Sequence, residues 1–173
     1  FYIGRYEAGI PEGDTSTSNK IGIPVSQKGA TVWTDITYTN SKASAESMIS
    51  NKYVQTGLIT GTAWDTICHW IKSDDELKDS RTYGNYNNSL APANENSGTK
   101  RTAGFNENWK TKNIYDLAGN VYEWTSEASS SFFIFRGGGY VNGGSDNPVS
   151  YRSRSNGSNT NDFIGFRPRL YIK

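Results

Sequence analysis

The sequence predicts an α+β domain in which two helices and small antiparallel sheets support long irregular loops. Three observations lead to this class: two segments of the first half have helical periodicity, the last third contains short strand-like runs, and no repeat of fixed period is present. A length of 173 residues suits one domain, so we expect a single domain over residues 1–173. Because the sequence opens directly on a strand-like run, we expect this domain to be the C-terminal part of a longer protein.

The first elements expected along the chain are a strand and a helix. Residues 1–7 mix aromatic and polar side chains in a way that predicts a strand, and residues 10–14 then form a turn. A helix is expected at residues 41–51, with Ser41 or Ser44 as its N-cap. The expected apolar face of this helix comprises Ala45, Met48 and Ile49.

A second helix gives the clearest pattern in the sequence. Its apolar stripe at i, i+3, i+4 and i+7 comprises Trp64, Ile67, Cys68 and Ile71. Thr60 or Thr62 is the expected cap, and Asp65 is expected in the first turn, where a carboxylate complements the helix dipole. Cys68 belongs to the stripe, so we interpret it as a small buried hydrophobic residue rather than a reactive thiol. His69 points away from the stripe and has no partner in sequence.

The second half begins with a long Asn-, Ser- and Gly-rich stretch, residues 80–104, which predicts an ordered loop region rather than a linker. Glycine- and asparagine-rich turns then separate several strand-like runs. The expected strands are residues 114–117, 121–125, 132–136 and 164–171.

Composition and charge exclude several classes of function. A formal net charge of +1 does not fit a nucleic-acid-binding domain, and no apolar run approaches the roughly 20 residues that cross a bilayer, so no membrane insertion is expected. With one Cys and one His, the chain can form neither an intrachain disulfide nor a Cys/His zinc site. Their adjacency, at Cys68 and His69, also argues against a nucleophile and base acting together.

Three motifs in the last third occur in a characteristic order. They are Asn-Ile-Tyr-Asp-Leu-Ala-Gly-Asn-Val-Tyr-Glu-Trp-Thr at residues 113–125, Phe-Arg-Gly-Gly-Gly-Tyr at 135–140 and Ile-Gly-Phe-Arg at 164–167. Together they resemble the formylglycine-generating enzyme (sulfatase-modifying factor) family. The resemblance covers nearly the whole chain and implies a C-type lectin-like fold, which agrees with the α+β prediction.

The resemblance also raises the question of a metal. The family binds structural calcium near the first motif, and the oxygen-bearing residues there that would serve as ligands are Asn120 and Glu123. The alternative is a hydrogen-bonded loop clamp without metal. No other cofactor is expected.

The third motif predicts an ion pair. Side chains alternate along a strand, so Arg167 should point to the face opposite to Phe166, where we expect its guanidinium to form a two-pronged (bidentate) pair with the carboxylate of Asp116 or Glu123.

The family's oxidase activity requires a pair of copper-binding cysteines in the stretch that follows the glycine motif. In this chain that stretch, residues 140–154, contains no cysteine, so we expect the domain not to be an enzyme. Two alternatives stay open: an oxidase with an altered active site, whose only thiol would be Cys68, and a purely structural module of a surface or virion protein.

The remaining prediction is a display surface over residues 140–162. It resembles the variable proteins of diversity-generating retroelements, whose last segment is diversified at adenines, because adenine substitution in Asn codons yields the Asn, Ser, Gly, Asp and Tyr found here. This resemblance implies a protein or glycan ligand on a target surface, and an extracellular, cell-surface or phage-tail location. The expected contact residues are Tyr140, Asn142, Ser145, Asn147, Tyr151, Arg152, Arg154, Asn156 and Asn159.

Overall fold

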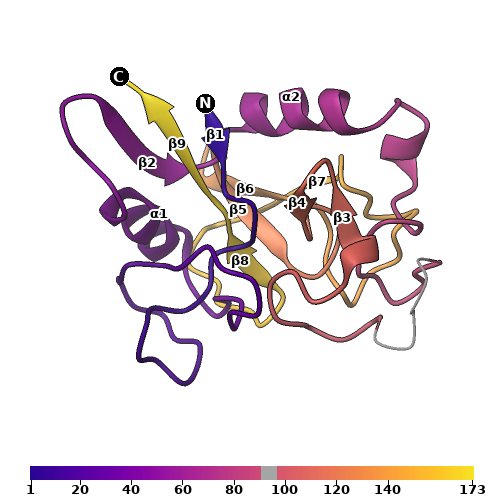
Figure 1. The fold of residues 1–173 in the computed structure, drawn as a ribbon, viewed down its shortest axis with the longest axis horizontal. Coiled ribbons are helices and arrows are strands. Elements are labelled where there is room, and N and C mark those ends of the chain that lie inside the picture. Colours follow the sequence, from indigo (N-terminus) through magenta and orange to yellow (C-terminus); the bar gives the residue numbers. More distant parts are fainter. Residues whose placement is uncertain (91–96) are drawn as a thin grey trace.

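A computed structural model describes residues 1–90 and 97–173. One of its sheets joins the two ends of the described chain: β1 (Tyr2–Ile3), β9 (Pro168–Ile172) and β2 (Val54–Leu58) pair antiparallel in the order β1-β9-β2. Both termini therefore lie at the same end of the molecule (Figure 1). The expected strand at residues 1–7 is reduced to two paired residues.

A four-stranded sheet carries the central part of the fold, in the order β7 (Arg152–Ser155), β6 (Phe132–Arg136), β5 (Tyr122–Ser129) and β8 (Ile164–Phe166). Its pairs are antiparallel except for β5 and β8, which run parallel. A small antiparallel pair, β3 (Lys110–Thr111) with β4 (Ile114–Tyr115), completes the sheets.

The expected strand at residues 164–171 is divided between two sheets. Its first part, β8, pairs with β5, whereas its second part, β9, pairs with β1 and β2. The chain changes sheets at Arg167, whose side chain lies in the core, and continues into Pro168, which has no N–H to donate to a ladder. One apolar run therefore supplies two elements, because pairing partners rather than local pattern set the strand ends.

The first helix, α1 (Tyr38–Ser47), begins earlier than expected. Thr37 is the N-cap, accepting a hydrogen bond from the backbone N–H of Asn40 at 3.3 Å. The predicted apolar face was wrong apart from Ala45, because Met48 and Ile49 follow the helix and Ile49 is 43% exposed. The buried face of α1 comprises Tyr38, Ser41, Ser44 and Ala45. Two serines can be buried there because their hydroxyls are hydrogen-bonded to Tyr38 O and Gly22 N.

The second helix, α2 (Gly61–Ile71), confirms the predicted stripe and the Thr60 cap, whose hydroxyl accepts from Ala63 N at 3.1 Å. Asp65 lies beyond the first turn and pairs with Arg136 instead of serving the helix terminus. Cys68 is buried as predicted, and burial raises the pKa of its thiol to about 12. His69 does have a partner, since its Nδ1 lies 3.6 Å from Asp74 Oδ1.

Among the described residues, the other helical segments are two single turns, η1 (Glu76–Lys78) and η3 (Glu107–Trp109). The expected loop at residues 80–104 includes positions 91–96, which lie outside the described residues. Within the described part of that loop Tyr86 is fully buried and its hydroxyl donates to Gly137 O at 2.8 Å. No helix in the described part of the chain has the length and apolarity needed to span a membrane.

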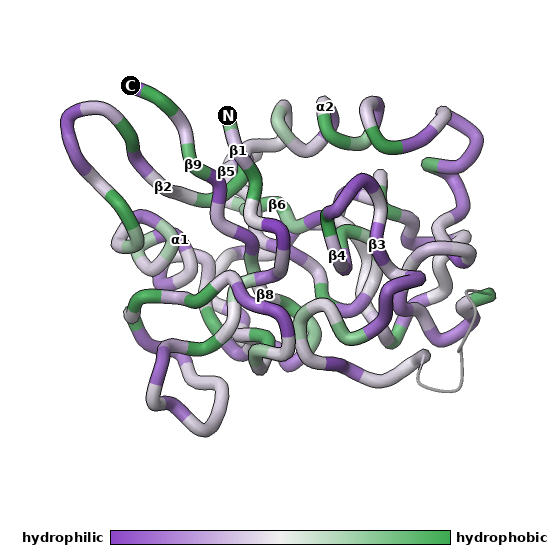
Figure 2. The backbone as a smooth tube through the Cα atoms, viewed as in Figure 1, coloured by the Kyte–Doolittle hydropathy of each residue, from purple (hydrophilic) through white to green (hydrophobic). Residues whose placement is uncertain are grey.

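Two large apolar clusters form the core. The first lies beneath α2 and contains the apolar stripe of that helix together with Tyr83, Tyr86, Leu117 and Val149. The second lies between α1 and the central sheet and is built around Trp33, Trp124 and Phe166. Figure 2 shows hydrophobic stretches in α2 and β8, while hydrophilic residues are frequent in the surrounding loops. The loops are thus held by two packed apolar clusters, one beneath α2 and one between α1 and the central sheet.

Candidate functional site

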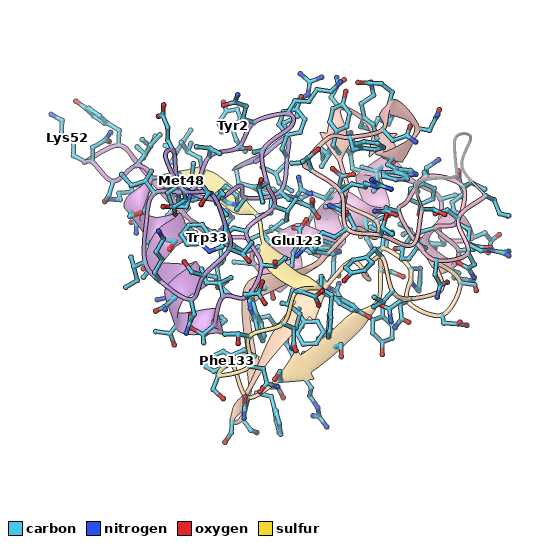
Figure 3. The ribbon with its side chains drawn as sticks, turned by 90° about the horizontal axis from the view of Figure 1, so that it is seen from below. Tyr2, Trp33, Met48, Lys52, Glu123 and Phe133 are labelled. Carbon is cyan, nitrogen blue, oxygen red and sulfur yellow. The ribbon has the colours of Figure 1, made fainter. Side chains whose placement is uncertain are left out.

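The first motif forms a buried clamp around one ion pair. Arg167 donates to both carboxylate oxygens of Glu123 at 2.7–3.0 Å, and both side chains are buried. The same guanidinium donates to Gly4 O at 2.9 Å and Tyr115 O at 2.8 Å, so it ties the N-terminal segment, β4 and β5 together. Figure 3 shows Glu123 in the interior, next to the C-terminal strands. The predicted two-pronged pair is confirmed with Glu123 as the partner.

Asn120 is the second part of this clamp. It has a positive φ of 57°, a conformation that asparagine adopts more readily than most residues, and it is fully buried. Its Oδ1 accepts from Asn85 Nδ2 and from Arg101 N, each at 3.0 Å, while its Nδ2 donates to Glu7 Oε2 at 2.6 Å. The side chain therefore connects three loops that are far apart in sequence.

The calcium ligands expected at Asn120 and Glu123 do not fit this geometry. The carboxylate oxygens of Glu123 face a guanidinium, and the amide oxygen of Asn120 already accepts two hydrogen bonds. A calcium ion needs six to eight oxygen ligands, and in the described part of the chain no three His, Cys, Asp or Glu side chains are placed to hold a metal. In this geometry Asn120 and Glu123 are engaged in the hydrogen-bonded loop clamp.

Two further carboxylates make the clamp sensitive to pH. Glu7 and Asp116 are buried beside Glu123, and Arg167 is the cation that acts on all three. Burial raises the pKa of Asp116 to about 7, and the backbone N–H of Gly104 and the Arg167 charge offset this only in part. Burial, together with repulsion from Asp116 and Glu123, also raises the pKa of Glu7 well above its usual value. The folded state therefore binds protons at this cluster more tightly than the unfolded chain.

We expect the protein to be more stable at about pH 5 than at about pH 7.5. A carboxyl whose folded-state pKa is raised contributes stability at low pH that is lost as the pH rises from its unfolded pKa of 3.8 towards about 7. The expected loss is roughly 1–3 kcal/mol in the free energy of unfolding, measured by urea denaturation across this range.

The matched control is Asp116→Asn, because asparagine tolerates the φ of 55° and keeps an oxygen to accept from Gly104 N. This variant should flatten the pH dependence. A wild-type stability that increases with pH over the same range would contradict the prediction.

The predicted display segment is anchored to the frame at both its start and its middle. Gly138 follows β6 with a φ of 74°, and a Cβ built there would overlap the carbonyl oxygen of Asn147. Close packing of the two backbone segments at this position therefore requires glycine. In the middle, Val149 is fully buried, its N–H donates to Ser80 Oγ at 2.9 Å, and its carbonyl accepts from Trp64 Nε1 at 2.9 Å.

The expected contact residues are all exposed or half-buried, and they fall into separate groups. The first group comprises Tyr140 and Tyr151, of which Tyr151 packs against the second core cluster. The hydroxyl of Tyr140 donates to Asp162 at 2.8 Å, and the ring of Tyr151 lies 6.4 Å from that of Tyr122. Burial, followed by the neighbouring Asp162, raises the pKa of Tyr140 to about 12, so its hydroxyl stays a donor at neutral pH.

A second group comprises Asn142, Ser145 and Asn147, and the segment at residues 141–144 that carries Asn142 is hydrogen-bonded to the loop at residues 85–89. Asn87 donates from its N–H to Asn142 O at 3.0 Å and from its Nδ2 to Val141 O at 2.9 Å. Asn88 Oδ1 accepts from Gly144 N at 2.9 Å. Sequence reasoning missed these supporting asparagines, although the asparagine-rich run that contains them was the available signal.

A third group lies on β7 and in the following loop. Arg152 and Arg154 pair in register with Arg136 and Ile134, so they project from the face of the sheet opposite to Phe135. Asn156 accepts from Ser158 N at 3.1 Å, and Asn159 donates to Ser155 Oγ at 2.9 Å, so both stabilise their own loop. The three groups therefore have different structural supports: the Tyr140–Asp162 contact, the loop at residues 85–89 and strand β7.

Two side chains beside β7 belong to this surface although the sequence did not single them out. Glu127 accepts from Arg152 at 2.5–2.8 Å, and the guanidinium of Arg154 lies 5.0 Å from the ring centroid of Phe132. The β5–β6 hairpin brings both of them next to β7. Only strand pairing across the sheet reveals this neighbourhood.

The mixed central sheet, the two helices and the long anchored loops define an α+β domain of the C-type lectin-like, formylglycine-enzyme-like class. The model of the sulfatase-modifying factor enzyme 1-like domain matches residues 38–169. The chain belongs to this family. No curated protein matched the sequence.

Two solved structures share the fold. Treponema denticola variable protein 1 aligns with a TM-score of 0.63 and 16% identity, over 97% of this chain and 83% of that one. PvdO from Pseudomonas aeruginosa aligns with a TM-score of 0.63 and 18% identity, over 97% of this chain and 78% of that one. At these identities the likeness establishes the fold alone.

Proposed function

We propose that this chain is a non-catalytic display domain that binds a protein or glycan ligand through the loops of residues 140–162. The observation that carries the proposal is the contrast between backbone and side chains in this segment. The frame holds the backbone through Gly138 and Val149, while every predicted contact side chain is exposed or half-buried. Rigid backbone with accessible Tyr, Arg, Asn and Ser is the chemistry of antibody-like binding loops.

The absence of catalysis is part of the proposal. The family's oxidase chemistry requires two cysteines in residues 140–154, where this chain has none. Its single thiol, Cys68, is 3% exposed, and burial raises the pKa of that thiol to about 12, so almost no thiolate exists at neutral pH. The likeness to PvdO concerns the fold and does not replace the copper-binding cysteines that this chain lacks.

We further propose that the domain is used as in diversified variable proteins. The support is its likeness to a solved structure named as a variable protein, together with the Asn-, Ser- and Gly-rich composition of residues 140–162. A domain used in this way would act outside the cell, on a cell surface or on a phage tail. Its partner would be a molecule on a target surface rather than a nucleic acid or a membrane interior.

The test begins with binding of the labelled domain to a glycan array and to a panel of intact bacterial cells. We expect the variant carrying Tyr140→Ala, Asn142→Ala and Asn147→Ala to lose binding by about tenfold or more, because aromatic anchors and their polar neighbours dominate such interfaces. Its melting temperature should stay close to that of the wild type. Tyr53→Ala is the control, since Tyr53 is 64% exposed next to β2.

Unchanged binding by the triple variant would contradict the assigned surface. The oxidase alternative makes a different prediction, namely copper-dependent oxygen consumption with a cysteine-containing peptide that Cys68→Ala abolishes. Such turnover would contradict the proposed function as a whole. No binding across both panels would favour the structural-module alternative.

A further inference from the structure

β7 is the edge strand of the central sheet, and among the described residues no strand pairs with its outer side. It pairs with β6 through all four of its residues. No backbone hydrogen bond from Arg152, Ser153, Arg154 or Ser155 to a residue outside β6 occurs in the described part of the chain. Because alternate residues of an edge strand direct N–H and C=O groups away from the sheet, β7 offers a template for one more strand.

The two arginines of β7 differ in how they are neutralised. Arg152 is paired with Glu127, and the interaction with that carboxylate raises its pKa. Arg154 is exposed, and no carboxylate forms an ion pair with it in the described part of the chain. Its guanidinium lies instead over the ring of Phe132, which is 40% exposed. The charge on this edge that has no ion-pair partner among the described residues is therefore the positive charge of Arg154, and it lies beside the partly exposed ring of Phe132.

We infer that the outer edge of β7 binds an extended acidic segment of a target protein by strand addition. This inference rests on the proposed function and specifies its partner as a polypeptide rather than a glycan. Backbone groups of the added strand would pair with the outer edge, which gives affinity with little dependence on sequence. Charge complementarity selects a carboxylate opposite Arg154, whose planar fork suits that group.

The geometry of a sheet also fixes the spacing of the partner's side chains. An added strand lies about 4.8 Å from β7, and its side chains alternate between the two faces. Arg152 and Arg154 share one face, whereas Ser153 and Ser155 share the other. The matching partner segment therefore carries acidic residues at every second position, on the face of Arg154, and strand-favouring residues such as valine between them, on the face of Ser153 and Ser155.

The test uses a fluorescein-labelled peptide of alternating glutamate and valine. A lysine–valine peptide of equal length and opposite charge is the control ligand. We expect the wild-type domain to bind the acidic peptide and not the basic one, more weakly as salt is added. Arg154→Glu should weaken binding of the acidic peptide by about tenfold or more. Amide resonances of residues 152–155 should shift, and their hydrogen exchange should slow, when the acidic peptide binds.

Arg5→Glu is the matched control. Arg5 is also exposed and stacked on aromatic rings, 5.7 Å from that of Tyr6 and 5.5 Å from that of Tyr115, so the substitution changes net charge equally at a different place. Its affinity for the acidic peptide should equal that of the wild type. An equal loss in both variants would show attraction by net charge alone and would overturn the inference.

Three other results would also overturn it: no binding of the acidic peptide to the wild type, binding without changes at the β7 amides, or a glycan ligand whose binding Arg154→Glu leaves unchanged. A charged edge strand also protects against aggregation, and that role alone predicts no peptide binding. If the peptide fails while the cell panel still shows binding that depends on Tyr140, the inference falls and the proposed function stands.

Discussion

Replacing Arg167 by methionine is expected to lower the free energy of unfolding by about 3–5 kcal/mol. Methionine keeps an unbranched apolar stem but removes the guanidinium, so the main effect is electrostatic and concerns the groups that lose their partner. Glu123 loses its only ion-pair partner in the described part of the chain, and Glu7 and Asp116 lose the nearby positive charge. The carbonyls of Gly4 and Tyr115 also lose their donors.

Urea denaturation of wild type, Arg167→Met and Arg167→Lys would check this expectation. Lysine keeps the charge but cannot form the two-pronged pair with Glu123, so its loss should be intermediate. Arg152→Met is the control, because the Arg152–Glu127 pair is partly exposed to solvent and such surface pairs contribute about 0–1 kcal/mol. Similar losses of unfolding free energy for Arg167→Met and Arg152→Met would show that the buried pair stabilises the fold no more than an ion pair at the surface.

Replacing Gly138 by alanine is expected to destabilise the protein by about 2–5 kcal/mol and to displace the display loop. The φ of 74° strains any residue with a Cβ, and that Cβ would overlap the carbonyl oxygen of Asn147 and lie 2.7 Å from a ring carbon of Tyr86. Backbone on one side and a fully buried ring on the other leave little room for relaxation.

Gly13→Ala separates the two contributions to this effect. Gly13 has a φ of 89°, but a Cβ there would have no neighbour within 4 Å. Its substitution should cost only the backbone strain, about 1–2 kcal/mol. Unfolding free energies measured in urea would compare the two variants, and equal losses would contradict the role assigned to the contact between Gly138 and Asn147.

These expectations divide the molecule into a frame and a surface. The motifs that identify the family, including Glu123, Gly138 and Arg167, are buried and hold segments together. The residues proposed to bind a ligand lie between those anchors and carry little of the folding energy. Substitutions at the surface should therefore change binding with small effects on stability, whereas substitutions in the frame should change both.

The sequence by itself determined the features that depend on neighbouring residues. The stripe and cap of α2, the strand at residues 132–136 and the buried role of Cys68 follow from periodicity and side-chain type within one segment. The motifs determined the family and the C-type lectin-like class. The pairing of Arg167 with a carboxylate also followed from local alternation, although two partners remained open.

Only the tertiary structure decided features that join distant segments. β7 has the sequence Arg-Ser-Arg-Ser, which lacks an apolar face because an edge strand at the surface buries little on either side. Asn120 and Glu123 act as a clamp rather than as calcium ligands, since their partners, Glu7 and Arg167, are 113 and 44 residues away. Hydrophobic periodicity reports on local burial, whereas electrostatic pairing and sheet neighbours are set by contacts that form only when the chain folds.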